Sequence, residues 1–196
     1  MRILLISANR ERMPYPVAPV GLAYIAASLL AAGHDVRAID LCFSEDIEHD
    51  LTQMVADFPP QVIGMSLRNL DNLTYPPSLS YLPELEETLA ILRRCTSAPI
   101  VVGGSGFSLA PLPLMQRLDA DFGIVGEGEE SMAKLVQRLE QGSSLDGIPG
   151  ILIKGNDAFL PPLPLDSFGV PARRVLDNER YLREGGMANI QTKRGC

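Results

Sequence analysis

Short apolar runs alternate with longer amphipathic segments along the first 141 residues of the chain. Polar or turn-forming residues bound each run, and this pattern predicts the buried strands of a parallel sheet. The second run, DVRAID, alternates apolar and charged residues, which predicts a strand with one more exposed side. The five predicted strands are residues 2–7, 35–40, 61–66, 99–104 and 121–126.

Proline and glycine mark the limits of the amphipathic segments between these runs. Pro19 stands near the start of the first segment and Gly33 follows its end, in the positions that each residue prefers at helix termini. Pro59 and Pro60 close the second segment. The five predicted helices are residues 20–32, 45–58, 82–95, 111–118 and 129–141.

Five strands that alternate with five helices predict an α/β fold, because right-handed crossovers place helices on both faces of a parallel sheet. We expect the flavodoxin-like (Rossmann-like) strand order 2-1-3-4-5. A ligand of such a sheet binds outside the carboxyl ends of the strands, near the point between strands one and three where the winding reverses.

The pattern changes after Gly142. Residues 151–154 and 158–160 flank a Gly-Asn-Asp turn and predict a C-terminal hairpin. The Pro-rich stretch 161–171 is typical of a linker. Residues 173–182 favour a short helix, and NIQTKRG resembles the start of a new strand before the last residue, Cys196.

Composition excludes some classes of protein. The net charge is −7 and the pI about 4.8, whereas a nucleic-acid-binding protein needs a basic face. The N-terminal apolar run is too short for a secretory signal, and no run is long enough to span a membrane. Three widely spaced cysteines, Cys42, Cys95 and Cys196, are more typical of reduced thiols than of disulfides. We therefore expect a cytoplasmic protein that binds neither nucleic acid nor membrane.

Candidate binding residues lie in the loops at the predicted carboxyl ends of the strands. The loop after the first strand, residues 8–21, is long for such a connection. Glycines after the fourth and fifth strands permit close approach of a flat ligand; tight turns and helix capping are the alternatives. The candidates are Ser66, Leu67, Arg68, Gly103, Gly104, Ser105, Phe107, Gly126, Glu127, Gly128 and Glu129.

Common catalytic and nucleotide-binding signatures are missing. The sequence contains neither GxGxxG nor GxxxxGK[ST], and its two histidines and three cysteines lack zinc-site spacing. No catalytic residue is predicted from these groups.

Three segments together carry a resemblance to a known family. They are PVAPVGLAYIAASLLAAGHDVRAID, VGGSGF, which ends at Phe107, and DFGIVGEGEESMAKLV at residues 121–136. The chain resembles the N-terminal cobalamin-binding domain of radical S-adenosylmethionine enzymes over essentially its whole length. In that family a similar tail leads into CxxxCxxC, whose thiolates bind a 4Fe-4S cluster. Cys196 matches the first of these cysteines and would bind the cluster only in a longer protein.

The resemblance implies a role for each loop. Gly103 and Gly104 would lie along the nucleotide tail of cobalamin, and Ser66 would contact its dimethylbenzimidazole base. Residues 126–129 would line the far side of the tail or the corrin edge. Classical corrinoid modules place DxHxxG after the first strand, whereas this chain has no histidine there. The resemblance thus implies cobalt without a protein imidazole below it.

The resemblance also implies a division of the chain and a function. Residues 1–145 would form the cobalamin-binding domain, 146–188 the hairpin and linker, and 189–196 the start of a covalently following barrel. The full-length protein would also use S-adenosylmethionine, for methyl transfer to an unactivated carbon or, alternatively, for cyclisation. The fragment alone would not be catalytic. The alternative is a flavodoxin-like sensing or interaction domain that binds no corrinoid.

Overall fold

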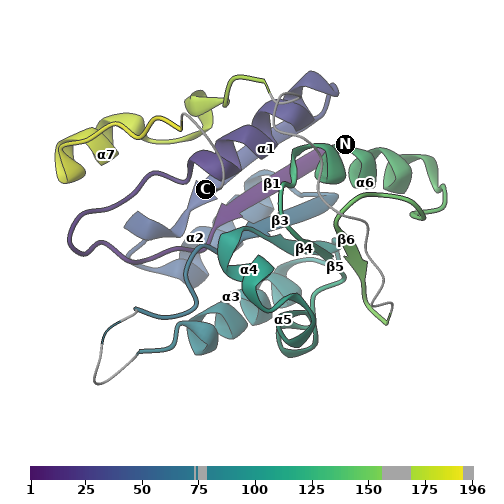
Figure 1. Ribbon diagram of the computed structural model, residues 1–196, viewed down its shortest axis with the longest axis horizontal. Helices are drawn as coiled ribbons and strands as arrows, with labels where there is room; N and C mark the ends of the chain where they lie inside the picture. The colour runs from purple at the N-terminus through teal and green to yellow at the C-terminus, as the bar shows by residue number, and fades with distance from the viewer. Residues whose placement is uncertain (73, 75–78, 156–168, 192–196) are drawn as a thin grey trace.

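The computed structural model contains one six-stranded sheet with the strand order β2-β1-β3-β4-β5-β6 (Figure 1). It describes residues 1–72, 74, 79–155 and 169–191. The first five strands pair in parallel, which confirms the predicted order 2-1-3-4-5. The strands are β1 (Arg2–Ser7), β2 (Asp35–Asp40), β3 (Val62–Ser66), β4 (Ile100–Gly103), β5 (Phe122–Ile124) and β6 (Ile151–Ile153).

The sixth strand differs from the prediction. Residues 151–153 form a strand as expected, but it pairs antiparallel with β5, with Ile151 opposite Ile124. Gly150, at φ +67°, makes the turn into β6, and its carbonyl accepts a hydrogen bond of 2.8 Å from the Val125 amide. The predicted hairpin partner, 158–160, lies outside the described residues, as does most of the predicted linker.

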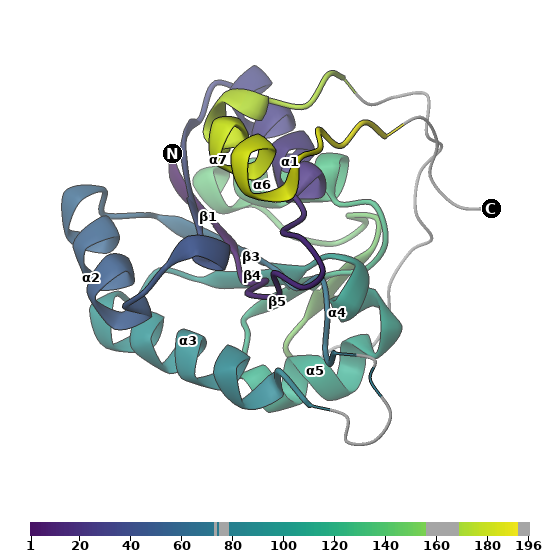
Figure 2. The same ribbon diagram turned by 90° about the vertical axis from the view of Figure 1, so that its left-hand side faces the viewer.

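Helices cover both faces of the sheet (Figure 2). The helices α1 (Val20–Ala31) and α6 (Glu129–Gln141) pack on one face, where Leu5, Leu29 and Leu135 belong to one buried cluster. The opposite face is covered by α2 (Ile47–Asp57), α3 (Leu82–Cys95) and α5 (Pro111–Leu118). All five predicted helices are confirmed, with ends that move by at most two residues.

Four short elements were not predicted as they occur. A 3-10 helix, η1 (Leu41–Phe43), follows β2, and α4 (Ser105–Leu109) follows β4. The helix expected at 173–182 is divided into η3 (Arg173–Val175) and α7 (Asn178–Gly185). Asp177 causes the division, because its side chain accepts a hydrogen bond of 2.9 Å from the Arg180 amide and caps a new helix.

Residues 189–191 have no regular secondary structure, so the expected strand does not begin there. The remainder of that predicted strand, together with Cys196, lies outside the described residues. Within the described part of the chain, no helix combines the length and apolar character that crossing a bilayer requires.

Gly123, in the middle of β5, tests the packing of the sheet. A Cβ atom at this position would lie 2.4 Å from Cζ of Phe107 and 2.9 Å from Sδ of Met115. We expect Gly123→Ala to lower the free energy of unfolding by about 1–3 kcal/mol, as overpacking does. Urea denaturation measures the change.

The matched control is Gly21→Ala in α1, where a Cβ would meet no heavy atom within 4 Å. Alanine in a helix should raise the free energy of unfolding by about 0.5–1 kcal/mol. A Gly123→Ala variant as stable as the parent protein would contradict the packing described for β5.

Candidate functional site

Small residues occupy the carboxyl ends of three adjacent strands. In the parallel register, Ser7 of β1 pairs with Ser66 of β3, and Ser66 pairs with Gly103 of β4. Ile124 of β5 continues the same row. The last row of the sheet therefore has two hydroxymethyl groups and a bare backbone where larger side chains would otherwise fill the space.

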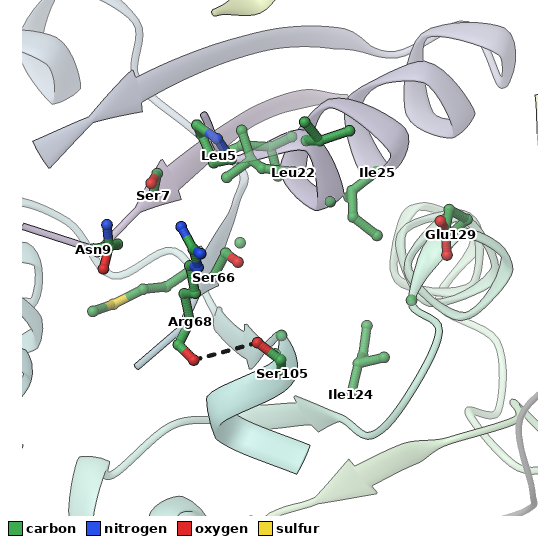
Figure 3. Close-up of a pocket in the computed structure, with 18 of the residues that line it drawn as sticks. Leu5, Ser7, Asn9, Leu22, Ile25, Ser66, Arg68, Ser105, Ile124 and Glu129 are labelled. Carbon is green, nitrogen blue, oxygen red and sulfur yellow. Dashed lines mark hydrogen bonds between the residues drawn. The ribbon is translucent and has the colours of Figure 1, made fainter. Parts of the chain in front are cut away.

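A cavity of about 900 Å³ lies beside this row, between the sheet and the helices α1 and α6. Its volume is within the range of small-molecule and cofactor sites. Figure 3 shows Leu5, Leu22 and Ile25 on one side of the cavity and Ile124 across from them. The apolar lining residues are chiefly Leu5, Leu22, Ile25, Val101, Ile124 and Met132.

Gly103 and Gly104 contribute to this cavity in different ways. A Cβ on Gly103 would make only ordinary contacts, 3.4 Å from the Ile124 carbonyl oxygen and 3.7 Å from its Cβ, so the fold itself tolerates a side chain there. Gly104 has φ +99°, and a Cβ on it would lie 2.7 Å from the Leu67 carbonyl oxygen. The glycine at 104 is thus required by the turn, whereas the one at 103 leaves space in the cavity.

The turn at Gly104 brings α4 against the loop that follows β3. The Leu67 amide donates a hydrogen bond of 2.8 Å to the Gly103 carbonyl, and the Gly106 amide donates one of 2.9 Å to the Leu67 carbonyl. The Ser105 hydroxyl donates to the Arg68 carbonyl at 3.3 Å (Figure 3). These bonds fix the backbone at Arg68, which lines the cavity.

The loop after β5 forms the opposite wall. Gly126 adopts φ +74°, and its amide donates a hydrogen bond of 2.9 Å to the Ser108 hydroxyl of α4. Glu129, the first residue of α6, is only 5% exposed and borders the cavity. The partial positive charge of a helix N-terminus favours a carboxylate in this place. Glu127 also lines the cavity from this loop.

Most of the predicted site residues are brought together by the fold. Leu67 and Phe107 are the exceptions: they are 1% and 0% exposed and belong to the core on the opposite face of the sheet. Cys196 lies outside the described residues. The predicted residues that line the cavity are Ser66, Arg68, Gly103, Gly104, Ser105, Gly126, Glu127, Gly128 and Glu129.

The long loop after β1 lines the cavity only at its two ends. Asn9 and residues 17–21 border the cavity. The middle of the loop is fixed to other elements: the Glu11 carboxylate accepts hydrogen bonds from the Tyr81 hydroxyl and, at 2.7 Å, from the Met13 amide. These bonds lower the pKa of Glu11, and burial together with the Glu11 carboxylate raises the pKa of Tyr81 to about 12.

Two further parts of the lining were not predicted. Ser7 ends β1, and its position in the row could have been inferred from the register of the parallel strands. Asn189, Ile190 and Gln191 border the cavity from the far end of the chain, and no local pattern in the sequence marks them. Among the described residues, no group of three or more His, Cys, Asp or Glu side chains could bind a metal ion.

This arrangement suits a bulky ligand with an apolar portion and several polar groups. The apolar lining can take an aromatic ring system, while Ser66, Arg68 and Glu129 supply a hydroxyl, a cation and a carboxylate for polar groups. His34 contacts the N-terminal amine and does not line the cavity. The geometry favours binding of a cofactor.

Comparison with solved structures agrees with this description. The radical S-adenosylmethionine methyltransferase TsrM from Kitasatospora setae, with cobalamin and a [4Fe-4S] cluster bound, is 30% identical at a TM-score of 0.75, over 82% of this chain and 31% of that chain. The same enzyme with tryptophan and a SAM analogue bound gives a TM-score of 0.80 at 26% identity, over 93% and 36%.

Curated relatives are longer proteins. Tryptophan 2-C-methyltransferase from Streptomyces laurentii is 28% identical over 96% of this chain and 41% of its own length. Anaerobic magnesium-protoporphyrin IX monomethyl ester cyclase from Synechocystis is 29% identical over 100% of this chain and 40% of its own length. The chain therefore spans about two fifths of the length of these relatives.

The family comparison covers the chain from the end of β1 into α6. The model of the B12 binding domain matches residues 6–136, which include every predicted site residue except Cys196. The chain belongs to the B12-binding domain family.

Proposed function

We propose that this B12-binding domain binds cobalamin in the cavity at the carboxyl ends of β1, β3 and β4. The observation that carries the proposal is the register row of Ser7, Ser66 and Gly103, which leaves about 900 Å³ beside an apolar wall. The size of this cavity suits part of a corrinoid, whereas the small cavity beside Tyr81 and Thr88 does not.

The residues around the cavity suit different parts of that ligand. The apolar wall suits the benzimidazole base, and the Ser66 hydroxyl at its edge can bond a ring nitrogen. Arg68 and Ser105 can bind phosphate or amide oxygens, and Glu127 and Glu129 can accept hydrogen bonds from amides or hydroxyls. Gly103, Gly104, Gly126 and Gly128 permit close approach of the ligand to the backbone. When bound, cobalamin supplies a transferable methyl group or a redox-active cobalt.

We further propose that the chain acts within a longer protein. Residues 1–145 would form the cobalamin-binding domain, 146–188 the connection, and 189–196 the entry to a radical S-adenosylmethionine barrel. Cys196 would then supply one thiolate to a 4Fe-4S cluster. The longer relatives named above, two methyltransferases and a cyclase, support methyl transfer to carbon as the activity of the whole protein, with cyclisation as the other outcome. We expect it in the cytoplasm.

Binding is tested directly with the purified chain. After incubation with hydroxocobalamin and gel filtration, we expect a corrinoid absorption spectrum to co-elute with the protein at near equimolar amounts. A chain that is folded by circular dichroism but elutes without corrinoid would contradict the proposal and favour a sensing or interaction domain.

Gly103→Val places a side chain in the cavity without disturbing the fold. The Cβ makes only ordinary contacts, and a β-branched residue suits a strand. Because the added methyl groups compete with the ligand for space, we expect an affinity about 5–100-fold lower, equivalent to about 1–3 kcal/mol. The matched control is Gly169→Val, at an exposed position where a Cβ meets nothing within 4 Å. Equal affinities for the two variants, measured by titration with hydroxocobalamin, would place the ligand elsewhere.

Ser66→Ala tests the polar edge of the cavity. Loss of one hydrogen bond to the ligand should weaken binding by about 0.5–1.5 kcal/mol, or about 2–10-fold. Ser143→Ala, at an exposed position after α6, is the control and should bind as the parent protein does. A second ligand tests whether Ser66 contacts the base. Cobinamide, which lacks the nucleotide tail, should bind Ser66→Ala and Ser143→Ala equally. A Ser66→Ala variant that loses affinity for cobinamide as well would contradict a contact with the base.

A further inference from the structure

The chain returns to the cavity after α6 and β6. We define the C-terminal strap as residues 169–191, which contain η3 and α7 and end beside the cavity. Figure 2 shows α7 beside α1, close to the loop that follows β1. The last residues of the strap, Asn189, Ile190 and Gln191, line the cavity together with residues of the sheet. The position of these residues depends on what fixes α7.

One buried tyrosine joins α7 to the sheet. Tyr181 is 3% exposed, and its hydroxyl donates a hydrogen bond of 2.6 Å to Oδ2 of Asp40, at the carboxyl end of β2. The other carboxylate oxygen of Asp40 accepts a bond of 3.1 Å from the Cys42 amide. Asp40 is also the register partner of Ser7, the β1 residue that lines the cavity. A polar connection therefore runs from the cavity wall through Asp40 to the strap.

Aromatic contacts complete this attachment. The rings of Tyr181 and Phe43 meet edge to face, with centroids 4.8 Å apart. The guanidinium of Arg180, on the strap, lies 4.2 Å from the centroid of Phe43, and that of Arg12, in the loop after β1, lies 5.3 Å from it. The Arg12 Nε also donates a hydrogen bond of 2.6 Å to the Cys42 carbonyl. Phe43, which follows β2, thus contacts both the strap and the first loop.

Two contacts carry this attachment onward to the cavity. A Cβ on Gly185 would lie 3.1 Å from the Pro16 carbonyl oxygen, so the end of α7 lies directly on the first loop. The Arg173 guanidinium donates a hydrogen bond to the Asn189 carbonyl and ties the two ends of the strap together. Ile190, next to Asn189, is 81% exposed although it is apolar and borders the cavity. A ligand in the cavity would reduce that exposure.

We propose that Tyr181 is a positioning residue, which seats the C-terminal strap over the cavity through Asp40 and Phe43 and thereby slows the release of bound corrinoid. The inference rests on the proposed function, because it assumes that the cavity binds a corrinoid. Tyr181 itself does not line the cavity, so it acts through residues 189–191. The strap forms one wall, and a ligand leaves more easily when that wall is detached.

The experiment measures release of ⁵⁷Co-labelled cyanocobalamin from the loaded chain during a chase with unlabelled cyanocobalamin. Tyr181→Ala removes the hydrogen bond and the aromatic contact, so we expect release to become about tenfold faster or more. Tyr181→Phe retains the ring and loses only the hydrogen bond, so its release rate should lie between those of the parent chain and Tyr181→Ala. Arg183→Ala, on the exposed side of the same helix, is the control and should release at the parent rate.

Hydrogen–deuterium exchange distinguishes positioning from a general loss of stability. In the parent chain, cyanocobalamin should slow amide exchange across residues 182–191. In Tyr181→Ala these amides should exchange at the same rate with and without ligand, while β1, β3 and β4 stay protected. The double variant Asp40→Asn/Tyr181→Phe should release the ligand no faster than the more affected single variant, because both substitutions break the same connection.

Each result decides between the two proposals. If the parent chain binds no cyanocobalamin, the proposed function fails and the inference fails with it. If the parent chain binds, but Tyr181→Phe and Tyr181→Ala both release at the parent rate, the inference alone is overturned. Should Tyr181→Ala not fold, Tyr181→Phe decides, because it leaves the packing against Phe43 intact.

Discussion

The site depends on the absence of large side chains at the ends of three neighbouring strands. Protein interiors are packed to the density of organic crystals, so a space of about 900 Å³ persists only where the sequence leaves it. Here Ser7, Ser66 and Gly103 fall in one row, because the parallel register aligns the last residues of β1, β3 and β4. A large residue at any of these positions would fill part of the gap below α1 and α6.

The period of two in a strand confines this opening to one face. Leu67 and Arg68 follow Ser66 directly, yet Leu67 lies in the core on the far face and Arg68 lines the cavity. The far face is filled by Leu4, Ile6, Met65 and other large residues that α2, α3 and α5 cover. The cavity therefore occupies only the carboxyl end of one face, whose remaining length packs against α1 and α6, while the other face is filled throughout.

Sequence reasoning predicted the residues around the cavity where physical rules are local and periodic. Strand order, helix ends and the glycine-rich loops follow from apolar runs, helix-capping residues and the topology of parallel sheets. It was less successful where the local path of the backbone determines the direction of a side chain. Phe107 follows a glycine-rich turn and was expected beside the ligand, but α4 directs its ring into the core against Gly123. Leu67 was expected beside Ser66, but it directly follows Ser66 in an extended segment, and alternation places its side chain on the opposite face.

Contacts between distant parts of the chain could not be predicted at all. Asp40 and Tyr181 are separated by 141 positions, and neither lies in a recognisable motif. The structure explains why such a pair can persist. Burial raises the pKa of Asp40 and so makes its ionised form costly, whereas hydrogen bonds from Tyr181, Cys42 and Ser7 favour the charge and lower the pKa. Three donors thus favour the ionised form of this buried carboxyl, and one of them comes from the strap. Under the role proposed for Tyr181, detachment of the strap would give Asp40 water in place of the Tyr181 hydroxyl and so exchange one donor for another.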